Sequence, residues 1–239
     1  MKHAAGWLSD VSGWCRDLLR LIFPLTCEVC GEALVDGERV LCLGCLAAMP
    51  GVDTGADSML SRRLAAAVKA ERVTAMFAYR RDTSYARVIQ KSKYNGRPDI
   101  DYNLAAEFAA KLKPTGFFEG IDLLVPVPMH SRKKIMRGFN QAEEIARGIS
   151  ENVGISVADN LVATRADASQ TRRSALDRIK NTHGRYEVVY PEELRGKHLL
   201  LVDDVITTGA TVMACCDALR HAVPDLKISI LALAATRLE

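Results

Sequence analysis

The chain has 239 residues, of which 49% are hydrophobic and 26% are charged, and its formal net charge is +3. This length and composition fit one well-packed core with a small appended module, and they exclude a largely disordered or fibrous chain. The net charge is too small to argue for nucleic-acid binding by itself. Positive charge is concentrated in residues 131–185, which form either a solvated surface or an anion-binding site.

Residues 1–22 are predicted to form an amphipathic helix, because apolar residues recur at helical spacing from Trp7 to Ile22. Such a helix either packs against the rest of the protein or contacts a membrane surface or a partner. Charged residues interrupt this segment, which argues against a secretory signal. No apolar run reaches the roughly 20 residues that a membrane span requires. We therefore expect a cytoplasmic protein without a membrane span.

Residues 23–50 contain two CxxC pairs, which supply Cys27, Cys30, Cys42 and Cys45 as candidate metal ligands. Each pair places two thiolates on one tight turn, and two such turns complete a tetrahedron around zinc. Four thiolates leave no open coordination position, so we expect a structural zinc ion that supplies much of the folding energy of this short segment. Redox-active or incidental cysteines are the alternative. The segment has too few basic residues for a strong DNA-binding face, although a protein partner stays open.

Residues 51–71 are interpreted as a linker and residues 72–239 as the main domain. Strands are predicted at 73–79, 123–127, 199–202 and 228–234. Helices are predicted at 85–93, 104–112, 139–149 and 211–222. Strands that alternate with helices predict an α/β fold with a mainly parallel sheet and helices on both faces. The polar, basic stretch 162–186 is predicted to be a long mobile loop.

The strongest functional signal is LLLVDDVITTGAT at residues 199–211. A buried strand leads into Asp203 and Asp204 at its carboxyl end, the edge where open α/β sheets bind ligands. The two carboxylates can accept hydrogen bonds from ribose hydroxyls. The turn that follows can wrap a phosphate with backbone N–H groups and hydroxyls, and the helix dipole adds attraction. Its candidate phosphate-binding residues are Thr207, Thr208, Gly209, Ala210 and Thr211.

A simpler interpretation of this segment is an acidic strand end followed by a threonine helix cap. That interpretation explains one Asp and one Thr but not the whole thirteen-residue pattern. The pattern therefore predicts a sugar-phosphate site, with hydroxyls bound at the two acids and a 5′-phosphate bound at the threonine turn.

This segment closely resembles the phosphoribosyl diphosphate motif of type I phosphoribosyltransferases. Nearly the whole chain beyond about residue 20 resembles one branch of them, the ComF family of phosphoribosyltransferase-like proteins. Besides the two CxxC pairs, the matching stretches are KSKYNGR at 91–97, LLVPVPMH at 123–130, RGFNQAEEIA at 137–146 and SQTRRSALDRIKN at 169–181. The chain departs from the family at Asn95, where the family often has Arg, and at Ser131, where it usually has Pro. Neither position touches the sugar-phosphate motif.

The resemblance implies a type I phosphoribosyltransferase-like α/β domain that follows a zinc ribbon. It implies phosphoribosyl diphosphate, or a related sugar phosphate, as the ligand, with Mg²⁺ bridging its phosphates. It also implies a diphosphate-binding loop at 128–137, directly after the strand at 123–127. The candidate donors in this loop are His130, Arg132, Lys133 and Arg137. The alternative for any one of them is a solvated basic side chain.

The same resemblance places a flexible lid at about 164–185, which would close over the reacting centre and exclude water. Arg172 and Arg178 are its candidate catalytic residues, because their charge would neutralise a departing diphosphate. The alternative is a connector without a catalytic role.

Two functions follow from these motifs. The first is an enzyme that transfers a phosphoribosyl group to an unidentified nitrogenous acceptor, with Asp203, Asp204, Arg172 and Arg178 as catalytic residues. The second is a non-catalytic ligand-binding accessory protein in DNA uptake during natural competence, a process with which the resembled family is associated. The resemblance also allows a homodimer and DNA-uptake proteins as partners.

Overall fold

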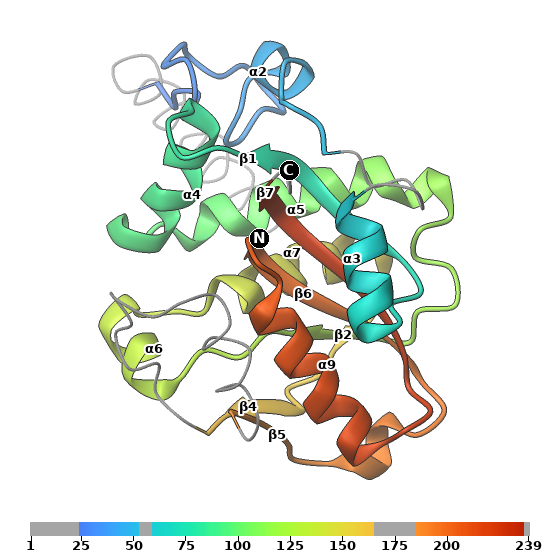
Figure 1. Ribbon diagram of the computed structural model, residues 1–239. Coiled ribbons are helices and arrows are strands. Elements are labelled where there is room, and N and C mark those ends of the chain that lie inside the picture. The colour runs from blue at the N-terminus through green and yellow to red at the C-terminus, as the bar shows by residue number, and fades with distance from the viewer. Residues whose placement is uncertain (1–23, 53–58, 165–184, 237–239) are drawn as a thin grey trace, which may run out of the picture. The chain divides into compact units, whose positions relative to one another are not determined.

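The computed structural model describes residues 24–52, 59–164 and 185–236 (Figure 1). The chain divides into two compact units, Met1–Met49 and Pro50–Glu239. The predicted helix over 1–22 lies outside the described residues. Within the described ranges, no helix combines the length and hydrophobicity that crossing a membrane would need.

The first unit has little regular structure. A bridge pairs Thr26 with Ala33, and the short helix α2 (Leu43–Ala47) begins directly after Cys42, its N-cap. The buried apolar residues described here are Cys27, Val40 and Leu41. Such a small apolar core cannot hold a chain of this length in one conformation, so the unit needs a further source of stability.

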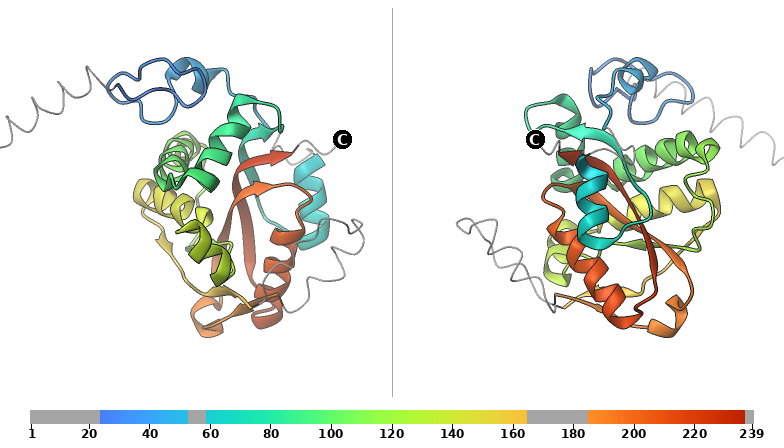
Figure 2. Two further views of the ribbon diagram at one scale, coloured as in Figure 1. Left: turned by 90° about the vertical axis from the view of Figure 1, so that its left-hand side faces the viewer. Right: turned by 45° about the vertical axis from the view of Figure 1, so that its right-hand side comes forward.

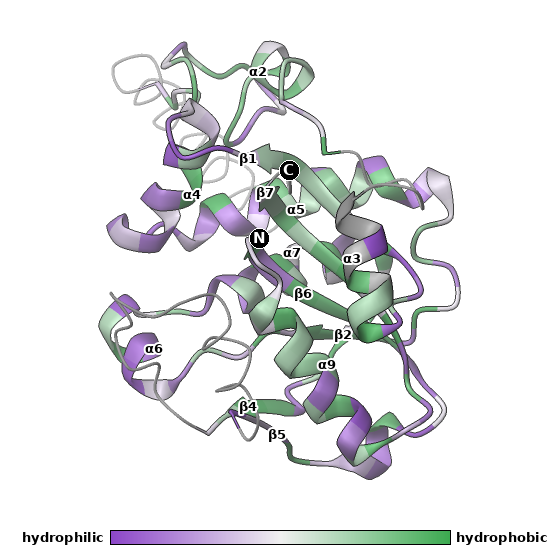
Figure 3. Cartoon of the chain, viewed as in Figure 1, coloured by the Kyte–Doolittle hydropathy of each residue, from purple (hydrophilic) through white to green (hydrophobic). Residues whose placement is uncertain are grey.

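The second unit is built on a five-stranded parallel sheet with the order β1-β7-β6-β2-β3 (Figure 1). Its strands are β1 (Val73–Tyr79), β2 (Leu123–Pro126), β3 (Ser156–Val157), β6 (His198–Ile206) and β7 (Lys227–Thr236). The central strands β6 and β7 each contain a run of apolar residues, at 199–202 and 230–235, coloured green in Figure 3. Strands that are buried on both faces require this composition, because helices cover each side of the sheet.

Helices cover the two faces of the sheet, as Figure 2 shows edge-on. One face carries α4 (Ser84–Asn95), α5 (Pro98–Leu112) and α7 (Gln141–Val153), and the other carries α3 (Met59–Val68) and α9 (Ala210–Ala222). The remaining elements are α6 (Ser131–Arg137), two short 3₁₀ turns at Lys113–Thr115 and Pro191–Leu194, and the antiparallel pair β4 (Leu161–Ala163) and β5 (Tyr186–Val188). The predicted α/β architecture with a mainly parallel sheet is confirmed.

Three local predictions differ from the structure. The segment expected to be a linker, 51–71, contains α3, because Leu64 and Val68 are buried in the core against β1 and α9. The segment expected to be a loop, 128–137, forms the helix α6 from Ser131 onward. The strand expected to end at Val202 continues to Ile206, because β7 stays paired with it beyond that point. Residues 165–184, most of the predicted mobile loop, lie outside the described part of the chain.

Candidate functional site

The candidate ligand site lies where the sheet opens at the carboxyl end of β6. Pairing of β2 with β6 ends at Pro126 and Val202, and the last contact is a 2.8 Å hydrogen bond that Val127 N donates to Val202 O. On its other edge, β6 stays paired with β7 through Ile206. Among the described residues, no strand pairs with this edge of β6 after Val202, and a pocket of about 250 Å³ lies there.

The residues that line this pocket come from segments that are far apart in the chain. They are Lys93 on α4, residues 127–130 after β2, Lys133 and Arg137 on α6, residues 140–142 at the start of α7, Ala163, Arg185 and Tyr186 around the β4–β5 pair, Asp203 and Asp204 on β6, and Thr211 on α9. The pocket thus has acids on one wall and basic groups on the others.

The acidic wall consists of Asp203 and Asp204. Asp203 is 9% exposed, and its Oδ1 accepts a 2.9 Å hydrogen bond from Asp204 N. The Oδ2 of Asp204 lies 2.5 Å from Nζ of Lys93, which reaches the pocket from α4. Lys93 balances the negative charge of Asp204, so the ligand-free pocket holds an ion pair that a ligand with hydroxyl groups would have to share.

The environment of Asp203 disfavours its ionised form. Burial raises the pKa of Asp203 to about 7, and the negative charge of Asp204 acts in the same direction. Asp203 is thus a group that can change protonation state near neutral pH inside the pocket. A ligand that supplies hydroxyl donors would favour the carboxylate form, because hydrogen bonds to a charged acceptor stabilise it.

The raised pKa of Asp203 predicts that this residue makes the folded second unit less stable as pH rises from about 4 to about 7. An unfolded aspartate titrates near about pH 4, so between about pH 4 and about pH 7 the folded state holds a proton that the unfolded state has lost. Asp203→Asn cannot lose a proton there. Its free energy of unfolding relative to the unmodified chain should therefore increase by about 1–3 kcal/mol from about pH 4 to about pH 8. Urea denaturation without ligand measures this difference.

The control for this experiment is Asp217→Asn, which removes an exposed carboxylate of α9 outside the pocket lining; an equal rise with pH in this control would show that the effect is not specific to Asp203. Buried Asp101, which accepts a hydrogen bond from Ser92, also has its pKa raised by burial to about 7. Asp101 is present in every variant, so its contribution cancels in the difference. A flat profile for Asp203→Asn would contradict the assignment of a buried, destabilised charge to this position.

The turn after β6 leads into the N-terminus of α9, where the one side-chain contact to the helix among the described residues is a long one, from Ala210 N to Thr208 Oγ1 over 3.4 Å. Gly209 is the N-cap, and it makes no side-chain hydrogen bond to the first turn of this 13-residue helix. Asn140, by contrast, caps α7, and Thr83 caps α4. Uncapped N–H groups at a helix N-terminus bind anions, and the macrodipole adds to the attraction. Thr211 of this first turn lines the pocket.

Backbone geometry explains why Gly209 occupies the centre of this turn. Its φ of +79° lies in the left-handed region, which favours glycine, and a Cβ there would come within 3.1 Å of Leu64 Cδ2. The end of β7 supports the turn from the other side, where Thr236 Oγ1 donates a 3.1 Å hydrogen bond to Thr207 O. Thr207, Thr208, Gly209 and Ala210 form the turn beside the pocket and are not part of its lining.

The basic wall is carried by the segment after β2 and by α6. His130, Lys133 and Arg137 line the pocket. His130 also caps α6, because its Nδ1 accepts a 3.2 Å hydrogen bond from Arg132 N. Of the four predicted donors in this segment, Arg132 alone is not part of the pocket lining; its side chain is exposed. The helix α6 rather than a loop therefore positions Lys133 and Arg137.

Several lining residues were not among the predicted binding residues. Lys93, Asn140, Gln141, Arg185 and Tyr186 reach the pocket from α4, α7 and the β4–β5 pair. The sequence offered a weak signal for some of them, because Lys93 and the 137–146 motif lie in stretches that carry the family resemblance. The predicted catalytic residues Arg172 and Arg178 lie outside the described residues.

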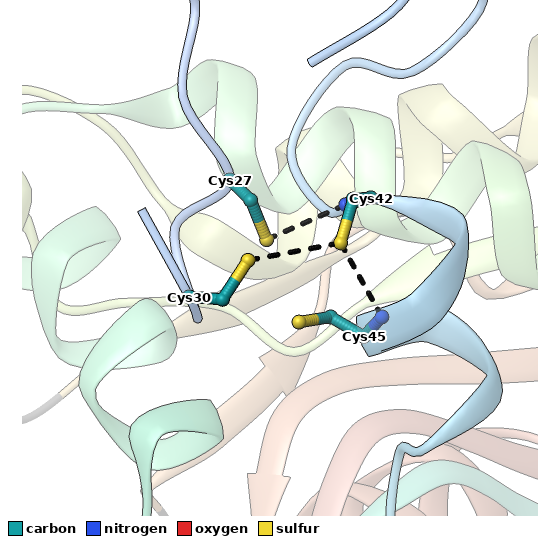
Figure 4. Close-up of side chains that lie close together, drawn as sticks. All are labelled: Cys27, Cys30, Cys42 and Cys45. Atoms are coloured by element: carbon teal, nitrogen blue, oxygen red, sulfur yellow. Dashed lines mark hydrogen bonds between the residues drawn. The ribbon is translucent and has the colours of Figure 1, made fainter. Parts of the chain in front are cut away.

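The four predicted metal ligands converge in the first unit (Figure 4). The sulfur atoms of Cys27, Cys30, Cys42 and Cys45 all lie within 4.8 Å of one another. The Sγ atoms of Cys30 and Cys42 are 3.8 Å apart, and Cys42 N donates to Cys27 Sγ over 3.4 Å. These four cysteines could hold a metal ion.

Electrostatics within the cysteine cluster also favour a cation. Burial raises the pKa of Cys27, but backbone N–H groups that donate to its sulfur outweigh burial and bring the pKa to about 6. Burial raises the pKa of the Cys45 thiol, and its three cysteine neighbours raise it further. Four thiolates this close repel one another unless a positive ion lies between them.

Comparison with known proteins finds one matching family and several relatives of the chain. The family described as "Phosphoribosyl transferase domain" matches residues 102–237. The chain is 29% identical over 204 residues to the DNA utilization protein YhgH of Salmonella typhi, which covers 83% of this chain and 85% of that protein. It is 31% identical over 131 residues to competence protein F of Haemophilus influenzae, which covers 52% of this chain and 57% of that protein.

Among solved structures, the chain is similar to the glutamine phosphoribosylpyrophosphate amidotransferase from B. subtilis, complexed with ADP and GMP. The sequence identity is 19% and the TM-score is 0.39. The match covers 59% of this chain and 30% of that chain.

Proposed function

The chain belongs to the phosphoribosyltransferase domain family and is related to ComF-type competence proteins, and from this premise we propose that it binds phosphoribosyl diphosphate and transfers the phosphoribosyl group to a nitrogenous acceptor. One observation carries the proposal. Two carboxylates stand next to a helix N-terminus whose N-cap is Gly209, across one pocket from the basic residues of α6. A ligand that fits this arrangement has hydroxyl groups between two anionic ends.

The acids and the α9 N-terminus form the sugar-phosphate half of the site. The 5′-phosphate would accept hydrogen bonds from the turn at 207–211 and its open N–H groups. The ribose hydroxyls would donate to Asp203 and Asp204. Because Lys93 already contacts Asp204 over 2.5 Å, the hydroxyls would join an existing ion pair rather than an isolated charge.

The basic wall forms the diphosphate half of the site. Lys133 and Arg137 would neutralise the diphosphate as the C1–O bond breaks and the acceptor nitrogen bonds to C1, while the acceptor loses a proton to solvent. His130, whose Nδ1 accepts from Arg132 N, would offer its other ring nitrogen as a hydrogen-bond donor. Mg²⁺, when bound with the ligand, would supply further charge neutralisation at the phosphate oxygens. Catalysis in this scheme rests on positioning and charge and needs no covalent protein nucleophile.

We also propose that the four cysteines of the first unit hold a structural zinc ion. An ion about 2.3 Å from four sulfurs at the corners of a tetrahedron places the sulfurs about 3.8 Å apart. The Cys30–Cys42 separation is 3.8 Å, and the other pairs lie within 4.8 Å. The four cysteines therefore fit zinc. The first unit needs such an ion because its apolar core is too small to stabilise it.

Asp204→Asn tests the sugar-phosphate half of the proposal. Asn is a poorer hydroxyl acceptor, so we expect roughly 10- to 100-fold weaker binding of phosphoribosyl diphosphate and of ribose 5-phosphate by calorimetry with Mg²⁺. Inorganic diphosphate lacks hydroxyls, and its affinity should not fall, because Lys93 loses its partner and adds positive charge to the pocket. Metal content should stay unchanged.

The matched control is Asp217→Asn, an exposed acid on α9, which should bind all three ligands as the unmodified chain does. Unaltered sugar-phosphate affinity in Asp204→Asn would move the ligand site away from β6. Release of diphosphate from phosphoribosyl diphosphate, assayed with a panel of bases and amines, tests the transfer step separately.

The relatives favour a second candidate function. Two of the relatives are named for DNA utilization and for competence rather than for a transfer reaction. As its second candidate function, this protein would be an accessory protein in DNA uptake, and its pocket would bind the sugar phosphate as a regulatory ligand. Tight binding of phosphoribosyl diphosphate without diphosphate release for any acceptor would favour this second candidate.

A further inference from the structure

Gln141, the first residue of α7, has a buried side chain at the wall of the pocket. It is 1% exposed and belongs to the pocket lining. Arg137 Nη1 donates a 2.6 Å hydrogen bond to Gln141 Oε1. A guanidinium can only donate, so this contact identifies the oxygen of the amide and places Nε2 on the other side.

The amide nitrogen of Gln141 has no hydrogen-bond acceptor among the described residues. Buried donors are nearly always paired, because leaving one unpaired forfeits its hydration without replacement. A buried, unpaired donor in the lining of a pocket therefore indicates an acceptor that arrives with a ligand.

Its neighbour Asn140 shows how a structural amide differs. Asn140 Oδ1 accepts from Ala142 N over 3.2 Å and so caps α7, while Nδ2 donates to Val127 O over 3.0 Å. Both ends of the Asn140 amide are thus used to join α7 to the segment after β2. Of these two amide side chains, only that of Gln141 has an N–H group left to donate to a ligand.

We propose that Gln141 is a ligand-contact residue whose Nε2 donates a hydrogen bond to an anionic oxygen at the diphosphate end of the ligand. The neighbouring pocket residues Lys133, His130 and Arg137 select for such an oxygen. Arg137 is also held by Tyr94, whose ring centroid lies 5.9 Å from the guanidinium carbon. This inference rests on the proposed function, because it assigns one more contact within the same site.

Two substitutions with opposite side effects test the contact. Gln141→Glu keeps an oxygen for Arg137 but replaces the donor with a second acceptor. Gln141→Met has similar volume and no charge, but it removes both the donor and the oxygen that Arg137 uses. Loss of the Nε2 donor is the only change that the two variants share. The controls are Gln90→Glu and Gln90→Met, on an exposed position of α4.

Calorimetry with inorganic diphosphate and Mg²⁺, and separately with ribose 5-phosphate, gives the readout. Both Gln141 variants should bind diphosphate roughly 10- to 100-fold more weakly, as for a hydrogen bond to a charged group. Their affinity for ribose 5-phosphate should stay within about twofold, since that ligand lacks the diphosphate. A structural role would instead lower the affinity for both ligands together.

Each other outcome overturns the inference in a distinguishable way. If only Gln141→Glu binds diphosphate more weakly, the cause is the added negative charge. If only Gln141→Met does so, the cause is the altered placement of Arg137. If the unmodified chain binds ribose 5-phosphate but not diphosphate, the inference fails and the sugar-phosphate half stands. If it binds neither ligand, the proposed function fails as well.

Discussion

Cys42→Ser is expected to release the proposed zinc ion and unfold residues 24–49 while the unit that begins at Pro50 stays folded. Cys42 has a central place in the cluster: its sulfur lies 3.8 Å from Cys30 Sγ, its N–H donates to Cys27 Sγ, and it caps α2. Serine offers a much poorer ligand, because the thiolate rather than the thiol or hydroxyl binds the metal.

The expected size of this effect comes from the metal's share of the folding energy. Structural zinc contributes about 10–16 kcal/mol in zinc-finger peptides, so one of four ligands accounts for about 2.5–4 kcal/mol. The apolar core described for this unit is too small to replace that contribution. Metal content by mass spectrometry and limited proteolysis within 24–49 measure the loss.

Cys216→Ala provides a matched cysteine control. Cys216 is fully buried on α9 in the second unit, so its replacement should destabilise that unit and leave metal content unchanged. Retention of a full equivalent of metal by Cys42→Ser, or equal loss in both variants, would show that the four cysteines are not the binding site.

Gly148→Ala should destabilise the second unit by about 3 kcal/mol, although helix propensity predicts the opposite sign. Ala is about 1 kcal/mol better than Gly in a helix interior. Gly148, however, lies in α7 where that helix packs on α5, and an added Cβ would overlap the backbone carbonyl of Tyr102. Backbone atoms cannot move aside as a flexible side chain can, so the steric cost exceeds the propensity gain.

Urea denaturation compares Gly148→Ala with the unmodified chain, and Gly51→Ala is the control, because a Cβ at Gly51 meets nothing within 4 Å. A displaced α7 would also move Asn140 and Gln141, so we expect weaker binding of diphosphate by the same variant. A more stable Gly148→Ala would show that α5 and α7 can separate at no cost, which contradicts their tight packing.

Local signals in the sequence were sufficient for the fold class and for the four-cysteine cluster. The apolar segment before Asp203 predicted a buried strand, and the two CxxC pairs predicted a cluster of four sulfurs, which the structure brings within 4.8 Å. Both signals lie in short segments whose residue types follow from their own environment: two buried faces for a parallel strand, and one tight turn for each thiolate pair.

Some elements could not be predicted because their conformation depends on contacts with distant residues. The helix α3 forms where a linker was expected, since Leu64 and Val68 gain burial only when β1 and α9 are in place. The predicted strand end at Val202 was wrong for a similar reason, because the β6 ladder beyond it is completed by β7.

The amino-acid sequence alone therefore determined the α/β fold class, the acidic pair after the apolar part of β6 and the four-cysteine cluster. Only the tertiary structure decided which distant side chains meet those acids. Lys93 on α4 pairs with Asp204, more than a hundred residues away, and Gln141 is buried with one donor unpaired. Strand order and helix packing set such proximities, and neither is encoded in the spacing of residues within one segment.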